Sequence, residues 1–171
     1  MSNGAFELRP AIAADLPQIT AIYAHYVLTH SATFEIAAPD LIEMQRRLEA
    51  LRQSGYPYWV AVAQGAVLGY CYIGTYRARV AYAHTAENAV YVAPEQARRG
   101  VGVALLNRCL EECPARGIRE VVAVIGDSAN RASIALHERC GFRHVGTLTA
   151  VGFKFGRWLD TVIMQRSLYN L

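Results

Sequence analysis

The stretch at residues 90–106 constrains the fold more than any other part of the chain. Residues 90–92 form a short β-type run that stops at Pro94, and Gly100 and Gly102 then precede apolar residues at helical spacing. A strand that leads through a glycine turn into a helix leaves unpaired backbone N–H groups at the helix N-terminus, where the helix dipole adds partial positive charge. The stretch therefore predicts a strand–turn–helix unit suited to an anion such as phosphate.

The rest of the chain alternates between strand-like and helix-like hydrophobic spacing. Strands are expected at residues 6–9, 58–63, 67–75, 87–92, 121–125, 142–154 and 159–168. Helices are expected at residues 15–30, 40–53, 103–113 and 130–140. Two capping boxes, Asp15 with Gln18 and Asp40 with Glu43, mark the first two helix starts. This order predicts an α/β (α+β) fold in which a mixed sheet carries helices on its faces.

The composition is that of a folded domain with a sizeable core. Hydrophobic residues make up 53% of the chain and charged residues 18%, which argues against disorder. A length of 171 residues makes one domain, residues 1–171, the expectation. The net charge is only +3, and no basic run is long enough to neutralise many phosphates. We therefore expect no nucleic-acid partner.

The cysteines and the N-terminal segment indicate the cellular compartment of the protein. None of the four cysteines forms a Cys-x-x-Cys pair, and all lie within apolar patterns, which predicts buried free thiols: Cys71, Cys109, Cys113 and Cys140. The segment at residues 1–10 lacks the charged and apolar regions of a signal peptide. No apolar run approaches the ~18 residues of a membrane span. We expect a cytoplasmic protein with no membrane partner and no metal site.

The glycine turn is compatible with several kinds of phosphate site. A P-loop requires Gly-x-x-x-x-Gly-Lys-Ser/Thr, which the chain lacks. A dinucleotide fingerprint requires Gly or Ala where the chain has Leu105, although Asp127 weakly mimics its ribose-binding acid. A third possibility is the Arg/Gln-x-x-Gly-x-Gly/Ala turn that holds the pyrophosphate of acyl-coenzyme A. A glycine turn without a ligand is the remaining alternative.

Two spaced motifs resemble those of the Gcn5-related N-acetyltransferases (GNAT). Residues 90–106 resemble motif A of that superfamily, and residues 130–142 resemble its later Asn-x-x-Ser-x-x-Leu-Tyr-x-x-x-Gly-Phe segment. The resemblance implies a mixed, mostly antiparallel sheet of roughly six to seven strands with splayed parallel central strands and about four flanking helices. It also implies acetyl-coenzyme A (acetyl-CoA) as the cofactor. One departure is Ala97, where the motif has Arg or Gln; Gln96 lies one residue early.

Three shorter segments narrow the resemblance to one branch of the superfamily. Residues 85–92, 136–138 and 151–160 are similar to the phosphinothricin N-acetyltransferases. That branch acetylates the α-amine of glutamate- or methionine-like compounds, such as phosphinothricin, methionine sulfoximine and methionine sulfone, and is usually dimeric. The resemblance therefore implies a small-molecule amine substrate and a homodimer. Acetylation of a polyamine, an aminoglycoside or a protein N-terminus, and non-catalytic binding of acyl-CoA, remain alternatives.

Acetyl transfer to an amine needs a base, a stabiliser for the carbonyl oxygen and a proton for the leaving thiolate. Glu87 begins the strand that leads into the glycine turn, where the superfamily carries a catalytic glutamate, so it is the expected general base. A backbone N–H near Tyr91 or Val92 is the expected oxyanion donor. His137, where many relatives have tyrosine, is the candidate general acid.

The resemblance also assigns residues to cofactor and acceptor binding. The cofactor set comprises the strand, the glycine turn, the first residues of the following helix and the later motif: Val90, Tyr91, Val92, Arg98, Arg99, Gly100, Val101, Gly102, Val103, Asn130 and Ser133. Because arginine binds carboxylates through a bidentate fork, Arg77 and Arg79 are candidates for an amino-acid carboxylate. Phe34 and Glu35 are expected to wall the acceptor site, with Lys154 reaching it from a dimer partner.

Overall fold

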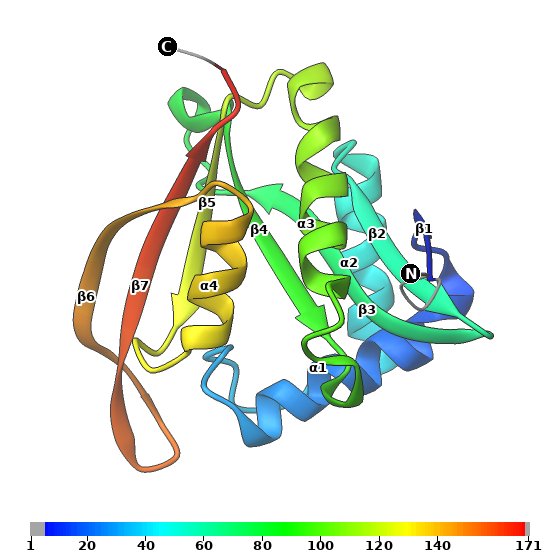
Figure 1. Ribbon diagram of the computed structural model, residues 1–171, viewed down its shortest axis with the longest axis horizontal. Helices are drawn as coiled ribbons and strands as arrows, with labels where there is room; N and C mark the ends of the chain where they lie inside the picture. Colours follow the sequence, from blue (N-terminus) through cyan, green and yellow to red (C-terminus); the bar gives the residue numbers. More distant parts are fainter. Residues whose placement is uncertain (1–5, 170–171) are drawn as a thin grey trace.

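A computed structural model describes residues 6–169 of the chain. Seven strands form one sheet in the order β1-β2-β3-β4-β5-β7-β6 (Figure 1). The strands are β1 (Glu7–Pro10), β2 (Tyr58–Ala63), β3 (Ala66–Thr75), β4 (Thr85–Val92), β5 (Glu120–Gly126), β6 (Arg143–Lys154) and β7 (Arg157–Ser167). The α-helices are α1 (Leu16–Thr29), α2 (Leu41–Gln53), α3 (Val101–Glu112) and α4 (Arg131–Arg139). Residues 1–5, which belong to the segment without signal-peptide features, lie outside the described residues.

The sheet is mixed and mostly antiparallel, as expected. Only β4 and β5 run parallel, and their pairing extends from Thr85↔Glu120 to Glu87↔Val122 before the two strands diverge (Figure 1). On its other side β4 stays paired with β3 from Thr75↔Ala86 to Gly69↔Val92. The expected splay of the central parallel strands is therefore present, and it begins at Glu87.

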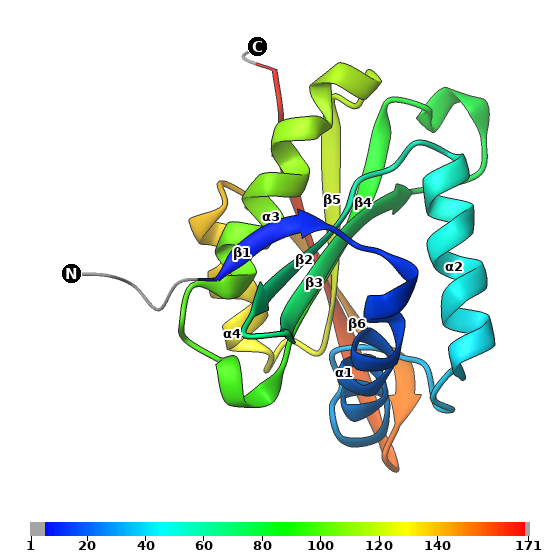
Figure 2. The same ribbon diagram turned by 90° about the vertical axis from the view of Figure 1, so that its right-hand side faces the viewer.

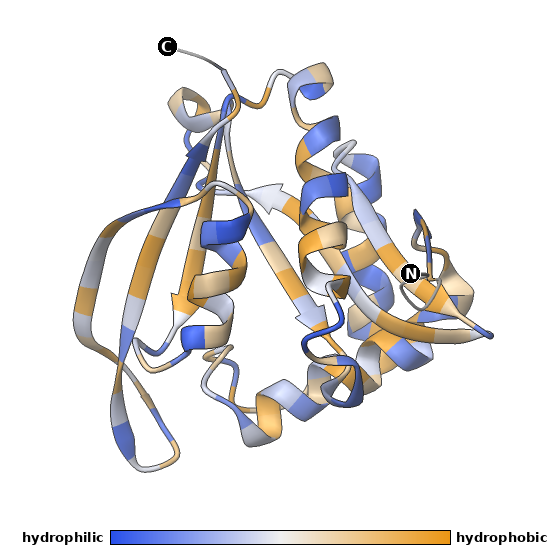
Figure 3. Ribbon diagram, viewed as in Figure 1, coloured by the Kyte–Doolittle hydropathy of each residue, from blue (hydrophilic) through white to orange (hydrophobic). Residues whose placement is uncertain are grey.

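The four helices cover both faces of the sheet. Helices α1 and α2 lie on one face, and α3 and α4 lie on the other (Figure 2). Each helix pair packs on its own core. Buried residues of α3, such as Leu105 and Leu106, join β5 in one core, whereas Ile19 and Leu48 join β2 and β3 in the other. The strands β3 and β5 between these layers are largely hydrophobic (Figure 3). All four cysteines are free and buried, as predicted.

Two helix starts differ from the sequence expectation. The Asp15 carboxylate does not cap α1; it accepts the Ile12 N–H at 2.9 Å and pairs with Arg9 at 2.7 Å. Gln18 reaches instead to Val67, whose backbone N–H it accepts at 2.8 Å. The capping box at Asp15 is therefore wrong, because Asp15 bonds to residues just before the helix and Gln18 bonds to Val67 of β3. In α2, Asp40 does accept from the backbone N–H of the helix, as predicted.

The ends of α3 and α4 are set by left-handed glycines. Gly100 has φ +80° and is the N-cap of α3, so the helix begins at Val101, two residues before the expected start. Gly141 has φ +79° and follows α4, where its N–H bonds to the Glu138 carbonyl at 2.9 Å and ends the helix as predicted. None of the helices within residues 6–169 combines the length and apolar character that a membrane crossing needs.

Candidate active site

Glu87 lies where the two central strands separate. It is paired with Gly74 of β3 on one side and is the last β4 residue paired with β5 on the other. Burial raises the pKa of its carboxyl group. None of the residues that the structure describes donates a hydrogen bond to that carboxylate. A half-buried carboxylate with a raised pKa and open oxygens has the properties of a general base.

The side chain of Glu87 lies on the α1–α2 face of the sheet. Side chains alternate along a strand, so Glu87 shares its face with Tyr91. Tyr91 packs edge-on against Tyr23 of α1, with ring centroids 5.1 Å apart, and also contacts Tyr70 of β3 at 5.5 Å. The candidate base therefore lies on an aromatic face that α1 covers, opposite to the face that carries α3.

The edge of β4 beyond Glu87 leaves backbone groups free. The Ala93 N–H bonds to the Leu68 carbonyl at 2.8 Å, so the pair Val92↔Gly69 is of the non-hydrogen-bonded type. The N–H of Val92 and, by alternation, that of Val90 thus point away from β3, where β5 has already diverged. Tyr91 uses its N–H in the ladder with β3. Of the two expected oxyanion donors, the geometry therefore favours Val92 over Tyr91.

The glycine turn after β4 has the geometry of an anion site. The first intrahelical donor near the start of α3 is the Ala104 N–H, which bonds to the Gly100 carbonyl at 3.0 Å. The N–H groups of Val101, Gly102 and Val103 precede it and have no side-chain cap. A Cβ on Gly100 would have nothing within 4 Å, so the turn is open. Three free donors at the positive end of a 12-residue helix suit a phosphate.

The second glycine of the motif has a different role from the first. A Cβ on Gly102 would meet the Leu136 side chain of α4 at 2.5 Å and the Val92 side chain of β4 at 3.3 Å. Gly102 therefore allows the close packing of α3 against α4 and β4.

The residues between β4 and α3 carry exposed charge. Arg98 is exposed and adopts a left-handed φ of +64°. Arg99 donates to the Gln96 side chain at 2.6 Å, so Gln96 is held within the turn. Ala97, which departs from the superfamily motif, is exposed and contributes no donor. Unlike Arg99, Arg98 has a guanidinium with no partner among residues 6–169.

His137 has both ring nitrogens in hydrogen bonds. Its Nδ1 lies 2.8 Å from the Ser133 carbonyl oxygen, which only accepts, so Nδ1 carries the proton. Its Nε2 lies 2.9 Å from the side-chain Nδ2 of Asn88 and accepts from it. Burial lowers the pKa of the ring, which keeps it neutral. The expected general-acid role does not fit this geometry, because neither nitrogen has a proton directed at a ligand.

Asn130 and Ser133 open α4, as the sequence motif predicts. The Asn130 side-chain oxygen accepts the Ser133 N–H at 3.2 Å and so caps the helix. The Ser133 hydroxyl lies 3.4 Å from His137 Nδ1. The Asn130 side chain therefore has a capping role in addition to its expected contact with the cofactor. This role leaves the Asn130 side-chain N–H₂ for a ligand.

The α1–α2 loop closes over the ends of β5 and β6. A Cβ on Gly126 of β5 would overlap the Ser31 carbonyl oxygen, and a Cβ on Gly152 of β6 would overlap the Phe34 ring. Both glycines therefore make room for the loop. Phe34 is 37% exposed, so part of its ring remains free to contact a substrate.

Glu35 is held by its own chain. Its carboxylate accepts from Arg47 of α2 at 2.7 Å and from the Tyr23 hydroxyl at 2.8 Å. Tyr23 also bonds to Thr33 at 3.0 Å. Sequence analysis did not identify Arg47, since only the fold brings α2 against the loop. Glu35 thus acts on the site by fixing the loop that carries Phe34.

Lys154 does not have the position expected of a residue that reaches the acceptor site from a dimer partner. Its ammonium is buried and donates to the carbonyl oxygens of His30 and Thr33, both at 2.8 Å. Burial lowers its pKa. Lys154 is therefore tied to the α1–α2 loop of its own chain and is not free to reach the site of another copy.

Arg77 and Arg79 lie on the connection between β3 and β4, at the Glu87 end of the sheet. Arg77 is exposed, and its guanidinium lies over the rings of Tyr76 and Tyr82, at 5.2 Å and 5.9 Å from their centroids. Arg79 is exposed and precedes a short 3-10 helix. Both arginines are placed on the connection that leads into the candidate base.

Asp127 does not behave as a ribose-binding acid. Its carboxylate accepts from Arg157 at 2.7 Å, Ser31 at 3.1 Å and the Ala129 N–H at 3.0 Å. It therefore joins the α1–α2 loop to the end of β5. Asp127 is thus engaged within the fold and does not support a dinucleotide site.

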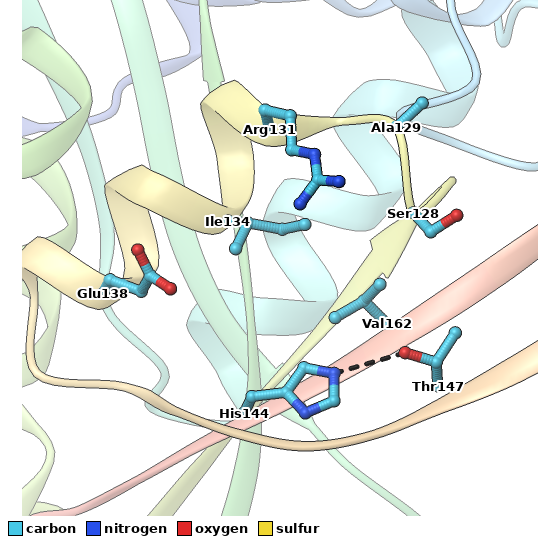
Figure 4. A pocket seen from close by; sticks show the side chains of 8 residues that line it. All are labelled: Ser128, Ala129, Arg131, Ile134, Glu138, His144, Thr147 and Val162. Atoms are coloured by element: carbon cyan, nitrogen blue, oxygen red, sulfur yellow. Dashed lines mark hydrogen bonds between the residues drawn. The ribbon is translucent and has the colours of Figure 1, made fainter.

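Two grooves lie outside the Glu87 site. One, of about 440 Å³, lies between α4 and the strands β6 and β7 (Figure 4). Arg131 and Glu138 extend into it from the helix, and His144 bonds to Thr147 along the β6 wall at 3.2 Å. Another, of about 270 Å³, lies between α1 and the β6–β7 hairpin. Neither groove is lined by Glu87 or His137.

Known proteins are similar to this chain in both sequence and fold. The Acetyltransferase (GNAT) family model matches residues 19–142. A phosphinothricin N-acetyltransferase of Alcaligenes faecalis is 50% identical, over 90% of this chain and 78% of that protein. An L-methionine sulfoximine/L-methionine sulfone acetyltransferase of Pseudomonas paraeruginosa is 43% identical, over 94% of each chain.

A solved structure has the same fold. The crystal structure of a GNAT superfamily phosphinothricin acetyltransferase from Sinorhizobium meliloti in complex with AcCoA superimposes with a TM-score of 0.91. It is 46% identical and covers 95% of this chain and 88% of that one. With the family model spanning most of the chain and these relatives spanning nearly all of it, this chain belongs to the GNAT family of acetyltransferases.

Proposed function

We propose that this chain transfers an acetyl group from acetyl-CoA to the α-amine of a small amino-acid-like acceptor of the phosphinothricin, methionine sulfoximine or methionine sulfone type. The observation that carries the proposal is the position of Glu87, a half-buried carboxylate at the divergence of β4 and β5. The relatives that are 50% and 43% identical to this chain are named for acceptors of this type, which supports the acceptor class.

The cofactor side of the proposed site is the α3–α4 face. The free N–H groups at the start of α3 and the charge of Arg98 fit a pyrophosphate. The free edge of β4 at Val90 and Val92 fits an extended amide-containing arm, because unpaired strand edges bind such chains through backbone hydrogen bonds. When bound there, acetyl-CoA supplies an activated acetyl thioester.

The acceptor side is the tyrosine-lined α1–α2 face. Arg77 and Arg79 lie on the β3–β4 connection at the Glu87 end of the sheet, and we assign the acceptor carboxylate to them because a guanidinium binds carboxylates by a bidentate fork. The part of the Phe34 ring that stays exposed suits the acceptor side chain. The acceptor amine and the acetyl thioester thus approach β4 from opposite faces of the sheet. They meet where β4 and β5 diverge, beginning at Glu87.

The residues around the gap have distinct tasks in this proposal. Glu87 takes a proton from the acceptor ammonium, and its raised pKa makes it a stronger base than an exposed carboxylate. The Val92 N–H stabilises negative charge as it develops on the carbonyl oxygen of the acetyl group. His137 is neutral and holds the Asn88 side chain, so the leaving thiolate of coenzyme A takes its proton from solvent.

A panel of acceptors tests the proposal. Thiol release from acetyl-CoA is measured with free amino acids, methionine sulfoximine, methionine sulfone, phosphinothricin, spermidine and an aminoglycoside. We expect saturable turnover with the methionine and glutamate analogues. Turnover confined to the cationic amines would overturn the acceptor class and favour the alternative of a polyamine or aminoglycoside transferase. Tight cofactor binding without turnover on any amine, including a peptide N-terminus, would favour a non-catalytic acyl-CoA-binding protein.

We further propose that the chain is one catalytic domain that works as a homodimer. Strand β6 is an edge of the sheet. Apolar side chains on β6, β7 and their connection are 50–66% exposed, which is unusual for a monomer surface: Val145, Leu148, Val151, Phe153, Phe155 and Trp158. Sedimentation analysis tests this, with a dimer expected for the natural chain and a monomer for Trp158→Lys. The buried free cysteines support a cytoplasmic location.

A further inference from the structure

The side chain of Asn88 is buried with one of its two polar atoms unpaired among the described residues. It is 7% exposed and follows Glu87 on β4. Its Nδ2 is bonded to His137, whereas its Oδ1 has no hydrogen-bond partner within residues 6–169. Buried polar atoms are nearly always paired in folded proteins, so an unpaired acceptor calls for an explanation.

His137 determines which atom of the Asn88 amide is left unpaired. Because its Nδ1–H is committed to the Ser133 carbonyl, its Nε2 has only a lone pair to offer. If the Asn88 amide turned over, Oδ1 would face that lone pair and the two acceptors would repel. His137 therefore locks the amide with Nδ2 toward the ring and Oδ1 directed elsewhere.

The free oxygen lies where the two parallel strands separate. The pairing of β4 with β5 ends one residue earlier, at Glu87↔Val122. Asn88 alternates with Glu87, so it lies on the face that carries α3 and α4, and its bond to His137 of α4 agrees with this. A ligand donor that reaches Oδ1 thus comes from the cofactor side of the proposed site, away from the acceptor amine.

We propose that Asn88 is a positioning residue whose Oδ1 accepts a hydrogen bond from an amide N–H of the pantetheine arm of coenzyme A. His137, in turn, holds the Asn88 amide in the orientation that presents oxygen. The inference rests on the proposed function, since that function supplies the cofactor. Pantetheine has a hydroxyl group at its end near the phosphates, two amide N–H groups and a terminal thiol. In acetyl-CoA the thiol is acylated, so the amide N–H groups are the donors that lie towards the reacting carbon.

The test compares three ligands by calorimetry on the natural chain and on Asn88→Leu, which keeps the branched shape but loses the Oδ1 acceptor together with the Nδ2 donor to His137. The ligands are coenzyme A, desulfo-coenzyme A and the nucleotide fragment that lacks pantetheine. For Asn88→Leu we expect about 3- to 10-fold weaker binding of coenzyme A and of its desulfo form, and unchanged binding of the nucleotide fragment. Asn88→Thr, which keeps an oxygen acceptor, is expected to bind coenzyme A within about 2-fold of the natural chain.

Other outcomes overturn the inference in distinguishable ways. Unchanged binding of coenzyme A by Asn88→Leu would mean that water alone satisfies Oδ1. Weaker binding of coenzyme A but not of its desulfo form would assign the contact to the thiol. Equal weakening of the nucleotide fragment would indicate a general disturbance of the site. If the natural chain bound none of the three ligands, the proposed function itself would fail, and this assignment with it.

His137→Phe separates positioning from proton donation. If His137 acts through Asn88, the variant is expected to raise the KM for acetyl-CoA by about 2- to 5-fold while the pH dependence of kcat stays unchanged. A loss of about 10²–10⁴ in kcat together with the loss of one limb of the pH–rate profile would make the histidine a general acid and overturn its positioning role.

Discussion

Substitution of Gly126 by alanine tests how the α1–α2 loop is held against the sheet. A Cβ at this position overlaps the Ser31 carbonyl oxygen and comes within 3.1 Å of the Phe34 ring. The obstacle is backbone, so the loop must move by roughly 1 Å before the contact becomes ordinary, and overpacking of this kind costs about 1–3 kcal/mol. Gly146→Ala on β6 is the matched control, because a Cβ there meets nothing within 4 Å.

Thermal unfolding and steady-state kinetics measure the two consequences of Gly126→Ala. For a domain of this size, 1 kcal/mol corresponds to about 2–4 °C in Tm, so a fall of about 2–12 °C is expected. The displaced loop carries Phe34 away from the acceptor site, and a shift of this size reduces kcat/KM for the acceptor by about 10- to 100-fold. The Kd of coenzyme A should stay unchanged. A Gly126→Ala chain as stable and as active as Gly146→Ala would refute the close contact of the loop with β5.

Two further predictions concern charge. Hydrogen bonds from Arg9 and the Ile12 N–H outweigh the effect of burial and lower the pKa of Asp15. Its stabilising contribution is therefore present above the usual pKa range of aspartate and is lost as the pH falls through the lowered pKa. Asp15→Asn should cost about 1–3 kcal/mol in urea unfolding at pH 7, and the difference should shrink in acid; a constant difference would refute the ion pair's role. Arg77→Lys loses the bidentate fork and should raise the KM for an amino-acid acceptor about 10-fold without changing the Kd of coenzyme A, and an unchanged KM would remove Arg77 from the site.

Local sequence patterns predicted those elements whose structure is determined by residues adjacent in the chain. The run from β4 through Gly100 into α3 was identified because its strand, turn and helix signals are contiguous. The end of α4 near residue 140 was identified for the same reason. The seven strands and four helices all occur close to their expected positions, since each has either a hydrophobic period or, at β5, a continuous apolar run.

Long-range contacts explain what the sequence did not predict. Lys154 bonds to His30 and Thr33, which lie more than a hundred residues away in the chain, so its own segment contains no hint of these partners. Asp15 is a different case, because its carboxylate bonds to Arg9 and to the Ile12 N–H only a few residues earlier, so one local arrangement replaces another. The neutral state of His137 depends on the meeting of α4 with Asn88 of β4.

The central claim is that Glu87 removes a proton from an amine at the divergence of β4 and β5. The measurement that tests it most directly is kcat/KM for methionine sulfoximine against pH, for the natural chain and for Glu87→Gln. Because burial raises the pKa of Glu87, the rate of the natural chain should fall on acidification at a pH above the usual carboxyl value of about 4.3. Glu87→Gln should lose about 10²–10⁴ in kcat and lack this limb, while its Kd for coenzyme A and its Tm at pH 7 are retained. A Glu87→Gln chain with the natural rate and the natural pH profile would contradict the account.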